Sequence, residues 1–117
     1  WDFDVESRRV VWNDVLYVIN GVNRHIPTEQ LGQMWRSVIH EEDEGEVYTK
    51  VAMVESGELE FIECLYRIVR HNDHEIRFLN ALIIGEKNEQ GKVKRLLGSV
   101  PAVTRNLFTS TCQPRRM

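Results

Sequence analysis

The first group of side chains that could do chemistry is His40 with the acidic run that follows it. Five carboxylates fall between Glu41 and Glu46, and an imidazole beside carboxylates could hold a hard metal ion or form an acid/base pair. Acidic residues are also favoured at a helix N-terminus, where the helix dipole stabilises each by about 0.3–1 kcal/mol. We therefore interpret the run as the exposed start of a helix, with neither a metal nor a catalytic role.

Cys64 is the next candidate, because a thiol can act as a nucleophile or a metal ligand. It lies in an alternating segment between Glu63 and Leu65, and the chain has one further cysteine, Cys112. Neither belongs to a Cys-x-x-Cys pair, so the two could form at most one bridge, which excludes zinc ribbons and disulfide-rich scaffolds. We expect Cys64 to be buried as a small hydrophobic side chain.

The other histidines and the serines offer no further reactive group. Haem would need an axial ligand, usually histidine, and residues 44–56 contain none. His25 falls in a loop and His71 and His74 in a turn, so we expect all three on the surface. No glycine-rich phosphate loop and no Gly-x-Ser-x-Gly motif is present. We predict no catalytic residue, no metal site and no cofactor in this domain.

Apolar residues could instead line a ligand pocket between the central helices and the inner face of a sheet. The candidates by expected facing are Trp12, Leu16, Ile39, Val47, Val51, Ile62, Cys64, Tyr66, Phe78 and Leu82. Asn80 and Tyr66 are the polar residues that would orient a ligand. The same set is what a filled core would contain, and we favour the filled core. The ligand of a real pocket would be a small, mostly apolar molecule with one or two hydrogen-bonding groups.

The N-terminal third supplies a hairpin and short helices to position these residues. Residues 1–5 and 9–12 are rich in β-formers around a polar stretch, which predicts a hairpin. Asn13 suits the N-cap of a short helix that ends at Gly21, and Thr28 suits a second N-cap.

The rest of the chain reads as one longer helix followed by strands. Residues 44–56 form an amphipathic pattern with Val47, Val51 and Val54 at i, i+4 and i+7. Residues 60–70, 76–85 and 93–104 read as three antiparallel strands joined by turns. Two strands, several helices and three long strands make an α+β layout. The outer sheet face is predicted to be only half polar and to suit self-association or a flanking helix, with Phe61, Leu65, Val69, Leu79 and Ile83 on it.

The composition fits a single soluble domain. The chain has 117 residues, 42% of them hydrophobic, and a net charge of −3, which suits one domain. Its longest apolar run, residues 81–84, is far shorter than the roughly 20 residues of a membrane helix, so we expect no direct membrane insertion. With a negative net charge, the protein is not expected to bind the phosphates of nucleic acid. Residues 105–117 differ from the rest, with three arginines and no acidic residue.

The order of these elements, with its landmark residues, resembles a PAS domain of the fold-3 type found in bacterial histidine kinases and diguanylate cyclases. The resemblance covers essentially residues 1–104. It rests on Trp1-Asp2-Phe3-Asp4, Val11-Trp12, Gly21, Trp35, Val38-Ile39-His40-Glu41-Glu42-Asp43, Tyr66-Arg67-Ile68-Val69-Arg70, Ile76-Arg77-Phe78, Gly91-Lys92, Gly98 and Val103-Thr104. It implies a five-stranded antiparallel sheet with short helices and one longer helix packed on one face, and it makes His40 and Asp43 architectural.

Four positions depart from the residues usual in that family. Glu42 stands where proline is usual, His74 replaces a turn glycine, and Phe78 replaces a tryptophan. Ala102 replaces the aspartate of a frequent terminal Asp-Ile-Thr motif. In the family this last motif lies where the sheet meets the following signalling helix, so we expect the coupling there to be built differently.

The resemblance implies a sensory or protein-interaction module, residues 1–104, within a larger bacterial signal-transduction protein such as a histidine kinase or a diguanylate cyclase. Such a module would act in the cytoplasm as a homodimer and relay ligand or partner binding through its last strand to an adjacent output domain. Residues 105–117 would begin the connector to that domain or form a disordered tail. The module itself would not be an enzyme. The alternative is a cofactor-bearing redox or light sensor with haem or flavin.

Overall fold

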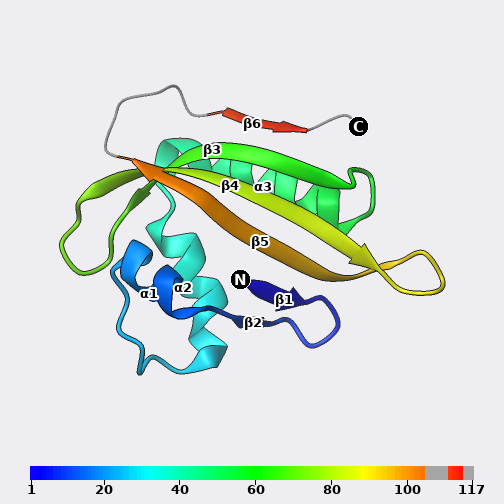
Figure 1. The fold of residues 1–117 in the computed structure, drawn as a ribbon, viewed down its shortest axis with the longest axis horizontal. Coiled ribbons are helices and arrows are strands. Elements are labelled where there is room, and N and C mark those ends of the chain that lie inside the picture. The colour runs from blue at the N-terminus through cyan, green and yellow to red at the C-terminus, as the bar shows by residue number, and fades with distance from the viewer. Residues whose placement is uncertain (105–110, 115–117) are drawn as a thin grey trace.

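One antiparallel sheet organises the protein (Figure 1), whose structure, a computed structural model, describes residues 1–104 and 111–114. The strand order is β2-β1-β5-β4-β3-β6. The strands are β1 (Asp2–Asp4), β2 (Arg9–Val11), β3 (Phe61–Val69), β4 (Ile76–Lys87), β5 (Val93–Thr104) and β6 (Thr111–Pro114). The first five are the strands predicted from the sequence, so the α+β layout with a five-stranded antiparallel sheet is confirmed, and β6 is an addition to it.

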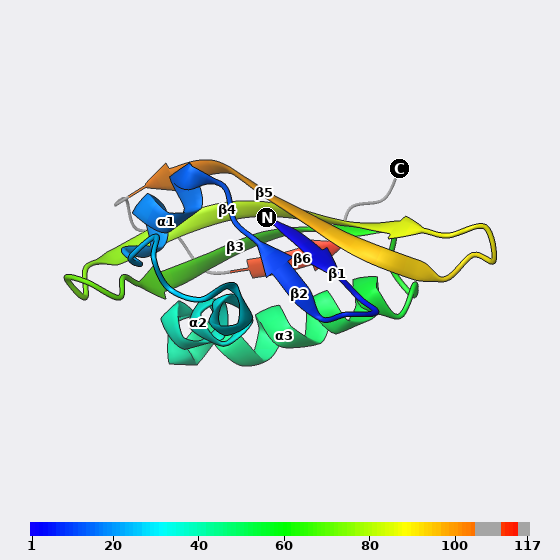
Figure 2. The same ribbon diagram turned by 90° about the horizontal axis from the view of Figure 1, so that it is seen from below.

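Two helices cover one face of this sheet (Figure 2). They are α2 (Leu31–Val38) and α3 (Glu41–Glu55), and the shorter α1 (Asp14–Asn20) precedes them in the chain. Within the described residues, none of these helices has the length and apolar character needed to cross a membrane.

The ends of α1 follow the predicted capping. The Asn13 side chain accepts a hydrogen bond from the backbone N–H of Leu16 at 3.0 Å, which satisfies one of the unpaired donors of the first turn. Gly21 ends the helix in the left-handed region at φ 66°, where a residue without Cβ is unstrained. Thr28, in contrast, is no N-cap: it begins the short turn Thr28–Gln30 after Pro27, and no side chain caps that turn.

Helix α3 begins earlier than the predicted residue 44. Its N-cap is His40, whose Nδ1 accepts a hydrogen bond from the backbone N–H of Glu42 at 3.1 Å. The acidic residues from Glu41 to Glu44 thus form the first turn, as the interpretation of this run as a helix start requires. The prediction that the run is exposed is wrong for Asp43, which is buried. The valine spacing did not predict this turn as helix, because the residues of the turn are polar.

The pairing of β3 with β4 corrects the predicted facing of β4. Every even-numbered residue of β3 lies opposite an odd-numbered residue of β4, as Ile62 does with Ile83 and Tyr66 with Leu79. Directly opposed residues point to the same face, so Leu79 and Ile83 face the helices and are 2% and 0% exposed. The prediction that they lie on the outer face is wrong. Both faces of β4 are apolar, so its alternation could not set the register.

Strand β6 lies along the outer edge of β3. Its register sets Cys64 opposite Cys112 and Leu65 opposite Thr111. Cys64 is fully buried, as predicted, but it is disulfide-bonded, so the expectation that it behaves as a simple hydrophobic thiol is wrong. The prediction of a connector or disordered tail over residues 105–117 falls partly on β6 and otherwise lies outside the described residues.

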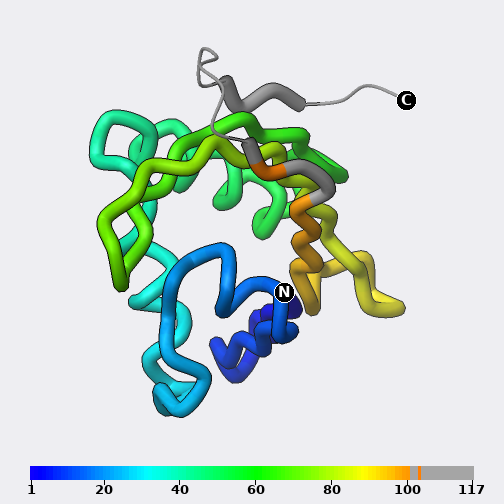
Figure 3. The backbone as a smooth tube through the Cα atoms, turned by 60° about the vertical axis from the view of Figure 1, so that its left-hand side comes forward, coloured from blue at the N-terminus to red at the C-terminus, as the bar shows by residue number. Residues whose placement is uncertain are grey.

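The hydrophobic core has two parts. The larger one lies between α3 and the inner face of β3 and β4, and the smaller one gathers around Trp12 and Leu31 at the N-terminal end. Trp1, Phe3 and Trp35 pack against both. Figure 3 shows the N-terminal segment, in blue, lying beside β5, in orange, in agreement with the pairing of β1 and β5.

Candidate ligand-binding site

An apolar cavity of about 110 Å³ opens where the two parts of the core meet. Hairpin residues, α2, α3 and β5 form its wall, and the apolar members are Trp1, Phe3, Val10, Trp12, Trp35, Val51 and Leu96. Strand register explains how the hairpin joins it: Phe3 lies opposite Val10 on one side and opposite Leu96 on the other. Because opposed residues share a face, these three side chains reach the cavity together.

Aromatic rings dominate this wall. All three tryptophans of the chain line the cavity. The rings of Trp1 and Trp35 are 6.0 Å apart and inclined by 57°, and Trp35 makes a second tilted contact with Tyr48 at 6.2 Å. Tilted and edge-on contacts present both ring faces and ring edges to a neighbour. The wall is therefore suited to a flat apolar group.

Two buried indole N–H groups near the cavity differ in how they are satisfied. The Trp35 side chain is hydrogen-bonded to Tyr66, whose burial raises its pKa to about 12 despite that bond. Trp12 is 6% exposed, and its Nε1 has no hydrogen-bond partner among the described residues. Buried donors are normally paired, but this nitrogen has almost no accessible surface, so it is an unpaired donor inside the packed core and does not face the cavity.

Charged side chains lie at the rim. Arg8 forms an ion pair with Glu55 at 2.9 Å, and its guanidinium sits 4.7 Å from the centre of the Phe3 ring. Arg36 stacks over Tyr48 at 5.6 Å, and no carboxylate of residues 1–104 lies within ion-pair distance of it. The rim thus carries one balanced ion pair and one arginine without a counter-charge.

Two glycines bear on access to the cavity. A Cβ at Gly98 of β5 would lie 2.2 Å from the Trp1 ring, so the indole can lie against the strand only because that residue has no side chain. Gly32 of α2 lines the cavity, and a Cβ there would meet no atom within 4 Å. Gly98 therefore allows Trp1 to pack against β5, and Gly32 leaves space beside α2 at the cavity.

Most of the predicted pocket residues belong to the filled core. Only Trp12 and Val51 line the cavity. Buried core positions, as the filled-core interpretation expects, are taken by Leu16, Ile39, Val47, Ile62, Cys64 and Tyr66. Through the β4 register, Phe78, Asn80 and Leu82 lie opposite Arg67, Leu65 and Glu63 on the other face, so their predicted inward facing is wrong.

The sequence prediction missed most of the cavity wall. Trp1 and Phe3 alternate on a strand, which marks a shared face, and Trp35 follows Leu31 at i+4, which marks one side of a helix. These signals place the residues on inward faces. They do not show that the hairpin and α2 leave space between them, because this depends on tertiary packing.

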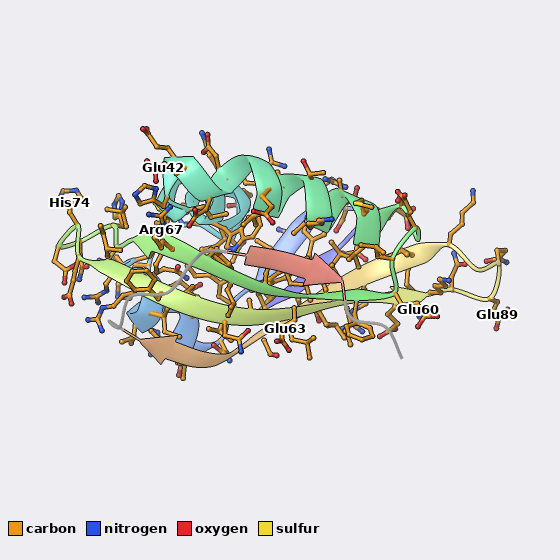
Figure 4. All side chains as sticks on the ribbon, turned by 90° about the horizontal axis from the view of Figure 1, so that it is seen from above. Glu42, Glu60, Glu63, Arg67, His74 and Glu89 are labelled. Atoms are coloured by element: carbon orange, nitrogen blue, oxygen red, sulfur yellow. The ribbon has the colours of Figure 1, made fainter. Side chains whose placement is uncertain are left out.

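The other polar cluster, at the start of α3, is fully paired. Asp43, 5% exposed, accepts hydrogen bonds from the Arg67 backbone N–H at 2.8 Å and from its guanidinium at 2.7 and 3.0 Å. Glu42 adds a contact to Arg67 at 3.1 Å, and Figure 4 shows these two side chains close together at the N-terminal end of α3. These hydrogen bonds raise the pKa of Arg67 further, chiefly through Asp43.

This Asp43–Arg67 joint fastens α3 to the edge of β3. The backbone N–H of His40 donates to the Arg67 carbonyl at 2.9 Å, so His40 and Asp43 are architectural. His25, His71 and His74 are exposed, as predicted, and Figure 4 shows His74 on the turn between β3 and β4. Within the described residues, no group of three histidine, cysteine or acidic side chains could hold a metal.

Comparison with known proteins agrees with this architecture. A family model described as the PAS fold matches residues 9–100, which takes in the chain from β2 through most of β5. Searches of curated proteins and of solved structures found no match. The matched range contains the cavity-lining parts of β2, α2, α3 and β5, together with the Asp43–Arg67 joint. The chain therefore belongs to the PAS fold family, in its fold-3 type.

Proposed function

We propose that this PAS domain, a sensory and interaction module, senses a small, mostly apolar molecule that binds in the cavity described above. The observation that carries the proposal is the unfilled space itself, with an aromatic wall to which all three tryptophans of the chain contribute. A completely filled core would leave no such space. A volume of about 110 Å³ favours a small molecule over haem or flavin, since drug-sized ligands occupy about 300–1,000 Å³.

The position of the cavity supports a relay through the last strand. Leu96 of β5 is part of the wall, and Phe3 pairs with it across the β1–β5 ladder. A ligand that favours one packing of these strands over another shifts the population of the two by its differential affinity. The shift would reach an output domain in the same chain through the end of β5 at Thr104. That domain would be a histidine kinase or a diguanylate cyclase, in a cytoplasmic protein.

Homodimerisation, or packing of a flanking helix, would use the outer face of the sheet. With the corrected facing of β4, Phe61, Leu65 and Val69 share this face with Leu82 and Ile84, and Ile84 is 39% exposed. Leu65→Glu and Ile84→Glu should therefore weaken the dimer and leave the fold intact. Sedimentation at high protein concentration measures this, with Val15→Glu as the control, because the Val15 side chain on α1 is 61% exposed. An unchanged sedimentation coefficient in both outer-face variants contradicts the dimer proposal.

A thermal-shift screen tests the sensory proposal. We expect members of a panel of small aromatic and apolar metabolites to raise the unfolding temperature of the wild-type domain, because ligand binding to the native state stabilises it. Gly32→Leu places a side chain in the open space at the cavity and should abolish the shift. Gly45→Leu, on α3, where a Cβ also meets no atom within 4 Å, is the matched control and should keep it.

Two results contradict the proposal. One is that no compound shifts the wild-type protein, and the other is that Gly32→Leu and Gly45→Leu respond alike. Val51→Phe, which fills the cavity from α3, replaces Gly32→Leu if that variant does not fold.

A further inference from the structure

We propose that the disulfide between Cys64 and Cys112 is a reversible thiol–disulfide switch that determines whether β6 stays paired with the edge of β3. This redox role goes beyond the proposed ligand sensing and does not depend on it, since Cys64 does not line the cavity. It follows from the position of the bond, the weakness of the β3–β6 pairing without it, and the reducing setting proposed for the protein.

The disulfide joins the two outermost strands on one side of the sheet. The chain has two cysteines, Cys64 is disulfide-bonded, and the register of β3 and β6 sets it directly opposite Cys112. Cys64 belongs to the core between the sheet and α3, and β6 lies near that helix as well. Figure 4 shows β6, in red, running along β3. The bond therefore fastens the edge strand of the sheet to the core.

Without the bond, little holds β6 in place. Its ladder runs only from Ile62 with Pro114 to Leu65 with Thr111, whereas β3 pairs with β4 along its whole length. The strand reads Thr-Cys-Gln-Pro, so it has no large apolar side chain to bury, and its proline has no N–H for the ladder. Short strand pairs are marginal in water. The family match, residues 9–100, ends before β6, which agrees with a five-stranded domain that folds without this strand.

Two molecules of a thiol reductant, such as glutathione, open the bond. The thiolate of the first attacks one sulfur and forms a mixed disulfide, while the other cysteine leaves as a thiolate. The second thiolate then displaces the remaining cysteine, each cysteine sulfur takes up one proton, and the glutathione leaves as its own disulfide. Cys64 is 0% exposed, so the reductant gains access when β6 opens locally at the edge of the sheet.

Reduction changes the path of the chain beyond β5. In the oxidised protein, β6 is fixed to β3, with β4 and β3 between it and β5. In the reduced protein, β6 can leave, and the backbone groups along the edge of β3 become open. The chain between Thr104 and Thr111 keeps the two thiols at a high effective concentration, so glutathione disulfide can restore the bond by the reverse step.

The compartment favours a switch over a permanent bond. We have proposed a cytoplasmic protein, and disulfides in a reducing cytoplasm are rare and are usually transient or redox-sensing. A bond that forms there only under oxidising conditions would fix β6 under those conditions alone. The position of β6 then reports the redox state of the surroundings without a cofactor.

Two measurements on the same samples test the switch. The wild-type protein is equilibrated in buffers with increasing ratios of reduced to oxidised glutathione. Free cysteines are counted by alkylation and mass spectrometry, and hydrogen–deuterium exchange is followed in peptides from β4 and β6. We expect both cysteines to change from bonded to free across the series, and amide exchange in β6 to become at least about tenfold faster on reduction. The β4 peptide, which lies between β3 and β5, should change little.

A variant separates the bond from other effects of the buffer. Cys112→Ser cannot form the bond, so its β6 should exchange fast at every glutathione ratio. Gln113→Ser, on the same strand, is the matched control and should keep the redox dependence of the wild-type protein. Cys64→Val, which fills the buried position with an apolar side chain of similar size, replaces Cys112→Ser if that variant does not fold.

Four results overturn the proposal. A bond that stays closed at the highest ratio is a permanent structural bond, and thiols that stay free at every ratio show that the bond does not form. A bond that opens without faster exchange in β6 shows that backbone pairing alone holds the strand. Equal exchange of β6 in the oxidised wild-type protein and in Cys112→Ser has the same meaning. None of these results bears on the cavity, which the thermal-shift screen tests separately.

Discussion

The Asp43–Arg67 joint and the cavity differ in whether their polar groups are paired. At the joint, Asp43 receives three hydrogen bonds from Arg67, and the charges compensate each other. At the cavity, the Trp12 N–H has no partner and Arg36 has no counter-charge among the described residues. Fully paired polar groups stabilise a fold, whereas a buried unpaired group reduces its stability. Arg77 Nε and Asn80 Oδ1 are also buried without a hydrogen-bond partner among the described residues, and neither residue lines the cavity. An unpaired polar atom therefore does not by itself mark a ligand site, and the cavity is distinguished by its unfilled space.

The largest expected effect is the loss of the joint. Asp43→Ala leaves a guanidinium and a backbone N–H without their acceptor, so we expect the free energy of unfolding to fall by about 3 kcal/mol. Urea denaturation measures it, with Glu42→Ala as the control, because the Glu42 side chain is 68% exposed and its pair should contribute less than about 0.5–1 kcal/mol. Similar losses in the two variants would contradict the structural role of Asp43.

The second effect concerns Tyr66, which lies between the two regions. Burial raises its pKa from 10.0 to about 12, so above pH 10 the unfolded chain loses this proton while the folded protein retains it. The free energy of unfolding should therefore fall between pH 10 and 12, by about 2–3 kcal/mol in total. Tyr66→Phe should remove that part of the decline, as measured by urea denaturation across this pH range. An unchanged slope in the variant contradicts the raised pKa.

The third effect tests the packing of the cavity wall. Gly98→Ala places a Cβ 2.2 Å from the Trp1 ring, so the ring must move, and we expect a loss of about 1–3 kcal/mol together with a shifted fluorescence maximum. Gly45→Ala is the control, because a Cβ there meets no neighbour within 4 Å and alanine in a helix is favoured by up to about 1 kcal/mol. A Gly98→Ala protein with wild-type stability and fluorescence would show that Trp1 does not rest on β5.

The smallest effect compares the two indole donors. Trp35→Phe removes a hydrogen bond to buried Tyr66, whereas Trp12→Phe removes a donor that has no partner. With similar volume lost in both, Trp35→Phe should be more destabilising by about 1 kcal/mol. Chemical denaturation of the two variants side by side gives the difference. A larger loss for Trp12→Phe in the ligand-free protein contradicts the unpaired state of its N–H.

Local signals in the sequence predicted the fold well. Capping by Asn13, the left-handed Gly21 and the alternation of β3 all depend on neighbouring residues, and the structure confirms each. The first turn of α3 was not predicted, because the prediction used the spacing of apolar residues and this turn is polar. The inner and outer faces of β4 were also predicted wrongly, because the register of a strand depends on the turn and on cross-strand pairing.

The candidate site was less predictable. The residues predicted to line a pocket are mainly residues that fill the core. A cavity forms instead where the side chains of neighbouring elements do not pack against one another. Whether the hairpin, α2 and Trp1 close on one another depends on contacts among segments far apart in the chain, such as Trp1 with Gly98. An unpaired donor likewise cannot be recognised in a sequence, because pairing is a property of the packed structure.

Native mass spectrometry of the wild-type and Gly32→Leu proteins, purified in parallel from the same cells, tests the central claim most directly. We expect the wild-type spectrum to contain a non-covalent adduct of a small molecule and the Gly32→Leu spectrum to lack it. Equal adducts in both spectra, or no adduct in the wild-type protein even after addition of the metabolite panel, would contradict the cavity as a ligand site.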